Sequence, residues 1–230
     1  MTDAEGDPET DTDMLSEVAD WLARVAKELP QSVSVAELGV RPKAPFKAMS
    51  VRGALMWRTE ELTRGAYQLL EHNDLAAAIL LIRGVVESAS LMARLTQLVF
   101  DRRAHPLAEL EANLSKMLHG WKNGPEGFPE AYSVLTLIGH LDKRTPGVLK
   151  AYNLMSESAH PNWTGVSGLF SWDDTPNYTT YFGRSQSRRG ALRTHALTAF
   201  ASSLMLFDLD YRNLAKILPD WLKELEPLPP

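Results

Sequence analysis

Apolar residues recur at helical spacing over most of this chain. Between residues 48 and 71 they are separated by steps of three, four and seven, which places them on one face of a helix. A second run, from Asp74 to about Arg103, is apolar around most of its circumference, so we expect this helix to be central. The same periodicity predicts further helices over residues 14–29, 107–119, 129–141, 145–160 and 187–218.

One segment has a different pattern. Residues 169–172 and 178–182 are rich in aromatic and β-branched side chains, and they flank the turn sequence Asp-Asp-Thr-Pro-Asn. This arrangement is typical of a β-hairpin. The sequence therefore predicts an all-α fold, a bundle of six to seven helices with one small β-hairpin at residues 168–183.

The ends of the chain differ from its middle. Residues 1–13 carry six carboxylates and no Lys or Arg, and we expect them to form a disordered acidic tail. Residues 14–47 are predicted to form an N-terminal helix and a linker. The helical bundle then spans residues 48–218, and residues 219–230 form a C-terminal tail.

Composition excludes several kinds of chemistry. The 230 residues include no Cys, which rules out thiolate catalysis, zinc ribbons and iron–sulfur clusters. The six His are scattered, so we expect neither a metal site nor a cofactor. Charges interrupt the most apolar stretch, residues 75–95, and no secretory signal precedes it, so we expect a cytoplasmic protein that does not enter a membrane.

A polar stripe crosses the predicted central helix. Arg83, Glu87, Ser90 and Arg94 fall within about 40° of one line, because helical residues advance about 100° each. A buried ion is costly unless it is paired. The stripe is therefore either a structural ion pair or an anion or nucleotide site, with Arg83 as the fork-shaped donor.

A second stripe lies on the helix that ends before Pro161. Asn153, Ser156, Glu157 and His160 align on one side of it. The helix dipole and Glu157 both favour a positive charge at His160. This His is either a structural capping group or a proton-transfer group.

Two further features are candidates for an RNA partner. Residues 163–182 hold six of the 19 aromatic residues, which either pack on the bundle or a second subunit, or offer a platform for unpaired bases. Arg184, Arg188, Arg189 and Arg193 surround the start of the last helix. Cations there oppose the helix dipole, so they either form a solvated face or bind an anionic partner.

The two polar stripes carry a family resemblance. The segments LLIRGVVESASLMARL (80–95) and AYNLMSESAHPNWTG (151–165) resemble HEPN-like helical domains, above all a bacterial group with an Arg-x-x-x-Glu helix and a Ser-Glu-x-x-His-Pro helix. The resemblance implies a helical bundle, often a homodimer. Many HEPN domains are metal-independent ribonucleases of toxin–antitoxin and phage-defence systems, in which an Arg precedes the His with four to six residues between them.

This chain departs from that pattern, because the group places its Arg where this sequence has Asn153. The implied mechanism uses His160 to move the proton of the RNA 2′-hydroxyl and an Arg to hold the scissile phosphate. Arg83 can take the second role only if its helix lies against the helix of His160.

The sequence thus predicts an RNA- or nucleotide-binding protein of bacterial defence or toxin–antitoxin type, with an antitoxin-like protein as a further partner. The alternatives are a ribonuclease that uses His160 and Arg83, and a non-catalytic structural or interaction module. The predicted catalytic residues are His160 and Arg83. The predicted binding residues are Glu87, Arg94, Asn153, Ser156, Glu157, Arg188 and Arg189.

Overall fold

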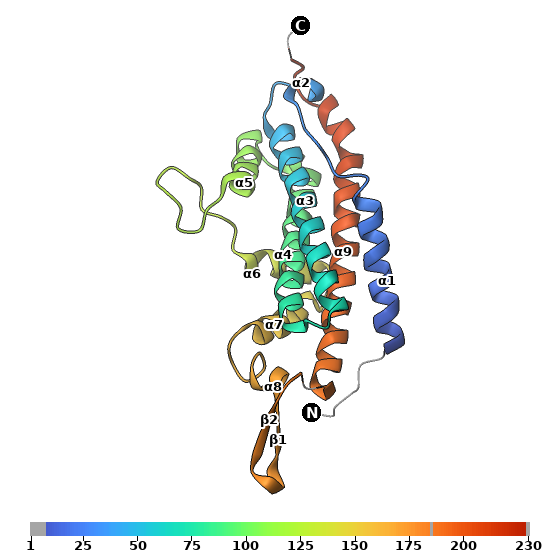
Figure 1. Cartoon of the computed structure of the whole chain (residues 1–230). Helices are drawn as coiled ribbons and strands as arrows, with labels where there is room; N and C mark the ends of the chain where they lie inside the picture. The colour runs from blue at the N-terminus through green and yellow to red at the C-terminus, as the bar shows by residue number, and fades with distance from the viewer. Residues whose placement is uncertain (1–7, 185, 229–230) are drawn as a thin grey trace. The chain divides into compact units, whose positions relative to one another are not determined.

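The computed structural model describes residues 8–184 and 186–228, and within them it confirms the predicted all-α fold (Figure 1). Two of its α-helices are single turns, α2 (Val35–Leu38) and α8 (Ser167–Phe170). Seven are longer: α1 (Pro8–Val25), α3 (Ala44–Glu71), α4 (Leu75–Phe100), α5 (Leu107–His119), α6 (Val134–Arg144), α7 (Val148–Ala159) and α9 (Gln186–Lys223). Short 3-10 helices, η1 and η2, cover Arg102–Ala104 and Thr175–Asn177.

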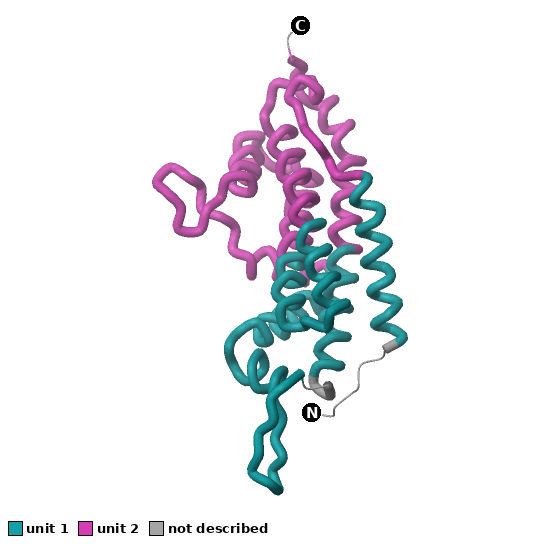
Figure 2. Tube along the Cα trace, viewed as in Figure 1, with its two compact units in different colours: residues 1–27, 60–86, 145–204 teal, residues 28–59, 87–144, 205–230 magenta. Residues whose placement is uncertain are grey.

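The described chain divides into two compact units where the sequence predicts one bundle (Figure 2). Unit 1 comprises residues 1–27, 60–86 and 145–204, and unit 2 comprises residues 28–59, 87–144 and 205–230. Helices α3, α4 and α9 each contribute one part to each unit. Hydrophobic periodicity does not reveal this division, because it continues without a break along each of these helices.

The first helix of unit 1, α1, begins at Pro8, six residues earlier than the sequence predicts. Residues 8–13, assigned above to a disordered tail, form the first turns of α1. The Asp11 carboxylate pairs with Arg193 at 3.3 Å and accepts a hydrogen bond of 2.8 Å from the Thr194 hydroxyl. These contacts to α9, together with acidic side chains at the helix N-terminus, stabilise a segment that composition alone describes as disordered.

The hairpin of unit 1 is confirmed. Strand β1 (Ser171–Asp174) pairs with β2 (Thr179–Phe182) in antiparallel register, with Trp172 opposite Tyr181. The η2 turn joins the strands, and Tyr178 leaves it in the left-handed conformation at φ 49°. The ribbon extends away from α7 and α8 of its own unit (Figure 1).

Unit 2 contains an ion pair whose carboxylate is deeply buried, whereas the Arg144 side chain is 41% exposed. Arg144, the last residue of α6, donates from both terminal nitrogens to the two carboxylate oxygens of Asp210 on α9. Only 2% of the Asp210 side chain is exposed. Helix α6 begins at Val134 and not at Pro129, because Pro129 and Ala131 hydrogen-bond the backbone of Trp121 instead.

Residues 219–228 of unit 2, which the sequence assigns to a tail, are ordered. Helix α9 continues through Pro219 to Lys223. The chain then runs beside residues 39–41, where Arg41 N–H donates to the Glu226 carbonyl and Leu228 N–H donates to the Gly39 carbonyl. Hydrogen bonds from Arg103 and Arg102 lower the pKa of Glu224 to about 2. Burial of the Trp221 side chain, which is 2% exposed, backbone pairing and this ion cluster together hold the segment.

Helix α4 is the one described helix that is long and apolar enough to cross a bilayer. Most of its apolar window, 61%, is buried inside the protein. Such burial fits the core helix of a soluble protein.

Candidate functional site

The helices that carry the two predicted catalytic residues lie side by side in unit 1. Arg83 on α4 donates a hydrogen bond of 3.1 Å to the Tyr152 hydroxyl on α7, and its guanidinium carbon lies 5.1 Å from the centre of the Tyr152 ring. The Arg83 Nε and the Ser156 hydroxyl are both buried without a hydrogen-bond partner in the described structure. The guanidinium is thus held mainly by one phenol.

His160 occupies a different position in the same unit. It is the C-cap of α7, its side chain is exposed, and its imidazole makes no hydrogen bond to any residue that the structure describes. The Glu157 carboxylate accepts a hydrogen bond of 2.8 Å from Asn162, whose own side-chain oxygen accepts one of 3.0 Å from the Gly165 N–H. The motif therefore folds as a tight local turn, and Asn153 lies exposed on the helix before it.

The polar stripe of α4 is divided between the units. Arg83 belongs to unit 1, whereas Glu87 and Arg94 belong to unit 2. Glu87 lines a cavity of about 230 Å³ together with Arg58, Lys116 and Tyr132. Arg94 lies half-buried near the C-terminal end of α6.

The arginines at the start of α9 bind the end of another helix of unit 1. Arg193 donates to the Leu70 carbonyl, Arg189 to the Asn73 carbonyl, and Arg184 to the carbonyls of residues 72 and 73 and to the Asp74 carboxylate. Burial, and then Arg184, lowers the pKa of Arg189. The negative end of the α3 dipole offsets the cost of these cations, so they have a structural role. The Arg188 side chain lies outside the described part of the chain.

The aromatic residues of the hairpin region are exposed, although Arg189 of α9 lies 5.9 Å from the centre of the Phe170 ring. The exposed fractions are 62% for Trp163, 39% for Phe170, 46% for Trp172, 97% for Tyr178, 46% for Tyr181 and 82% for Phe182. Trp172 and Tyr181 stack across the ribbon, with ring centres 5.9 Å apart.

A cavity that the sequence analysis did not predict lies between α4 and α6 in unit 2. It has a volume of about 200 Å³, and its charged or titratable lining residues are Arg94, His140, Lys143 and Arg144, with no carboxylate among the lining side chains. We call it the basic cavity. Arg94 also hydrogen-bonds the Tyr132 hydroxyl; burial raises the pKa of Tyr132, and Arg94 opposes that shift. Of these residues only Arg94 is among those predicted from the sequence. His140, Lys143 and Arg144 lie on α6, far from Arg94 in the sequence, and no local pattern indicates that the two helices share a cavity.

A second cavity adjoins the basic cavity. It has a volume of about 480 Å³ and shares Gln97 and Arg144 with its neighbour. Its other lining residues include Asn213, Ile217 and Phe100, whose side chain is 67% exposed. The two neighbouring cavities thus differ in character: one is lined by cations, and the other by an aromatic ring and an amide.

No family model, curated protein or solved structure matches this chain. Within the described residues, no group of three His, Cys, Asp or Glu is arranged to hold a metal ion.

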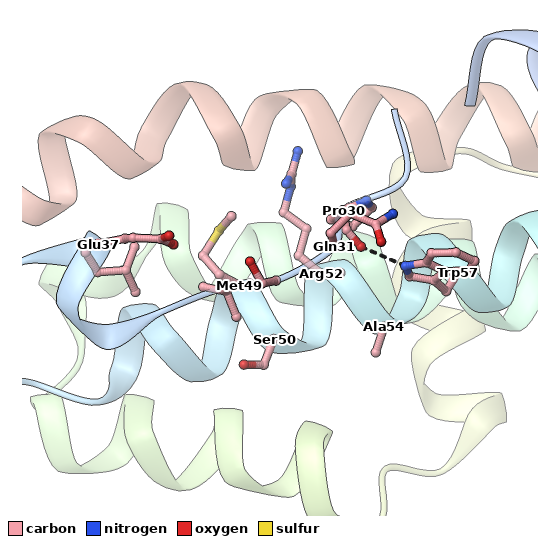
Figure 3. A pocket seen from close by; sticks show the side chains of 12 residues that line it. Pro30, Gln31, Glu37, Met49, Ser50, Arg52, Ala54 and Trp57 are labelled. Carbon is pink, nitrogen blue, oxygen red and sulfur yellow. Dashed lines mark hydrogen bonds between the residues drawn. The ribbon is translucent and has the colours of Figure 1, made fainter. Parts of the chain in front are cut away.

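The largest of these cavities, about 520 Å³, lies in unit 2 between the segment at residues 30–38 and the first turns of α3 (Figure 3). The Trp57 indole N–H donates a hydrogen bond of 2.8 Å to the Pro30 carbonyl. Arg52 donates a hydrogen bond to the backbone carbonyl of Tyr211, and its guanidinium carbon lies 3.4 Å from the centre of the Tyr211 ring. Burial lowers the pKa of Arg52. Because its one lining cation already has these partners, we assign this cavity no ligand.

Proposed function

We propose that this protein binds a nucleotide, with the phosphate in the basic cavity and the base in the adjoining one. The observation that carries the proposal is the lining of the basic cavity, which combines three cations and a His with no carboxylate. Guanidinium groups match the geometry of phosphate oxygens, and a Lys ammonium adds a point charge.

The charge balance favours an anion in this cavity. Arg144 is already paired with Asp210, so its charge is largely compensated. The C-terminal end of α6 contributes about half a negative charge, which is less than the charge of either remaining cation. Arg94 and Lys143 therefore leave a net positive potential at the cavity.

The adjoining cavity suits the rest of a nucleotide. Ligand cavities for small molecules usually measure roughly 300–1,000 Å³, and the two compartments together lie in that range. The exposed Phe100 ring offers a stacking surface, and the Asn213 amide can both donate to and accept from a base edge.

Removal of the cations should weaken nucleotide binding. We expect Arg94→Gln to weaken the binding of AMP about 10- to 100-fold, the usual effect of losing a charged hydrogen bond, and Lys143→Gln to weaken it several-fold. Isothermal titration calorimetry measures both effects. Lys223→Gln, which changes an exposed Lys bonded to Asp220 in the same unit, is the matched control and should leave the affinity unchanged.

Two comparisons test the ligand class. Adenosine, which has no phosphate, should bind at least 10-fold more weakly than AMP, and equal binding of the two would refute the proposal. An eight-nucleotide RNA that binds more tightly than AMP, and loses affinity in the same variants, would assign the cavity to an RNA phosphate. We also propose that the protein is a cytoplasmic homodimer and that an antitoxin-like protein is a further partner.

RNA cleavage is the second candidate, and the observation that favours it is the exposed imidazole of His160 on the helix that contacts Arg83. Single-stranded RNA should be cut in the presence of EDTA. His160→Ala should lower the rate at least 100-fold, as expected for a group that transfers a proton, and Asn153→Arg should raise it. His119→Ala, at the exposed end of α5, is the control. Pure protein that leaves RNA intact would exclude this activity.

A further inference from the structure

The aromatic residues of the hairpin region form a surface that the proposed nucleotide site does not use. We call it the hairpin surface and define it by Trp172, Tyr178, Tyr181 and Phe182, which lie on the two strands and their turn. All four lie in unit 1, and the nucleotide site lies in unit 2. Exposed apolar groups gathered in this way mark interaction sites in soluble proteins, and Trp and Tyr are the residues that contribute most to protein interfaces.

The ribbon that carries this surface has no hydrophobic core of its own. Most positions of β1 and β2 are exposed, and none is buried. Two-stranded ribbons are marginally stable alone, so the cross-strand stack of Trp172 on Tyr181 stabilises this one. A side chain at Gly183 would come within 3.2 Å of the Trp172 ring, so the backbone supports the indole from that side.

The hairpin strands and their turn carry carboxylates and no cation. Arg189 of α9 lies 5.9 Å from the Phe170 ring centre, but it is 4% exposed and donates to the Asn73 carbonyl. Between Lys150 and Arg184 the chain has no Lys or Arg, whereas Glu157, Asp173 and Asp174 carry carboxylates. Arg184 is bonded to Asp74 and to the end of α3. Aromatic ring faces are themselves electronegative and attract cations. A phosphate backbone would meet repulsion here.

We infer that the hairpin surface docks a partner protein that presents Arg or Lys side chains. The guanidinium or ammonium groups pair with Asp174 on the face of the ribbon that carries the Trp172–Tyr181 stack, and with Asp173 on the face that carries Phe182. The charge complementarity selects this occupant over an RNA strand, because aromatic faces and carboxylates both favour a cation.

A fluorescently labelled octa-arginine peptide, titrated into the full chain at physiological salt and followed by anisotropy, tests the inference. Trp172→Ala with Tyr181→Ala should weaken binding at least 10-fold. Asp173→Asn with Asp174→Asn should weaken it several-fold, and it keeps the side-chain oxygens that accept hydrogen bonds from Thr180 and Asn177. Phe128→Ala removes an exposed aromatic side chain of unit 2 and should change nothing.

Each other outcome overturns the inference. Equal binding by wild type and both hairpin variants would assign the peptide to another acidic region, such as residues 1–13. Binding of an eight-nucleotide uridine RNA that needs Trp172 and Tyr181 would show a base-stacking surface. Self-association that the aromatic variant abolishes, measured by sedimentation, would show that the occupant is a second copy. AMP affinity should be unchanged in both hairpin variants, so this test is independent of the nucleotide site.

Discussion

Replacing Arg144 with methionine is expected to lower the free energy of unfolding by about 3 kcal/mol, near the lower end of what breaking a buried ion pair costs. The substitution leaves the Asp210 carboxylate, with 2% of its side chain exposed, without its bidentate cation. In a protein of this size the loss corresponds to a fall in Tm of roughly 6–12 °C. Denaturant unfolding and calorimetry both measure it.

The control is an ion pair on α9 whose carboxylate is less buried than that of Asp210. Arg212 pairs with Asp208 at 2.9 Å one turn away, and 57% of the Arg212 side chain and 18% of the Asp208 side chain are exposed. Arg212→Met should change stability by less than about 1 kcal/mol. The double variant Arg144→Met with Asp210→Asn should lose less stability than the sum of the two single variants. Additive losses would contradict the importance of this pair.

Replacing Gly165 with alanine should destabilise the turn after α7 by about 2–4 kcal/mol. The added Cβ would lie 2.1 Å from the His160 carbonyl oxygen and 2.6 Å from the Ser158 carbonyl oxygen. Both atoms belong to the backbone, so the turn must open and the hydrogen bond from Gly165 N–H to Asn162 is lost. Hydrogen exchange over residues 160–170 should become faster.

Gly139 provides the comparison for this variant. It lies inside α6, and a Cβ there meets no heavy atom within 4 Å. Because alanine favours helix more than glycine does, Gly139→Ala should raise stability by up to about 1 kcal/mol. If Gly165→Ala is tolerated as well as Gly139→Ala, the close turn at the end of α7 does not exist in solution.

The His-Pro motif shows how far local reasoning reaches. The sequence correctly ends the helix before Pro161, because a proline disfavours helical conformation in the residue before it. It pairs Glu157 with His160 by helical spacing. The structure pairs Glu157 with Asn162 instead, because the turn that Gly165 permits brings that amide back to the helix end.

The arginines near the start of α9 show where local reasoning fails. By sequence alone, four cations at a helix N-terminus suggest an anionic partner outside the chain. In the structure, three of them bind carbonyl groups and a carboxylate at the end of α3, more than 100 residues earlier. Arg189 is 4% exposed and cannot reach a partner in solvent without leaving that end.

The sequence by itself determined the all-α class, the presence of the seven longer helices, the hairpin and the absence of thiol chemistry, because helical period, turn residues and composition are local properties. Only the tertiary structure decided which charged side chains remain available to bind a ligand. In the structure, Arg94, Lys143 and Arg144 line one cavity, and Arg189 donates a hydrogen bond to the Asn73 carbonyl at the end of α3. Residues 8–13 and 219–228 are ordered. The reason is physical: the free energy of a charge depends on the groups that folding brings beside it, and these come from distant parts of the chain.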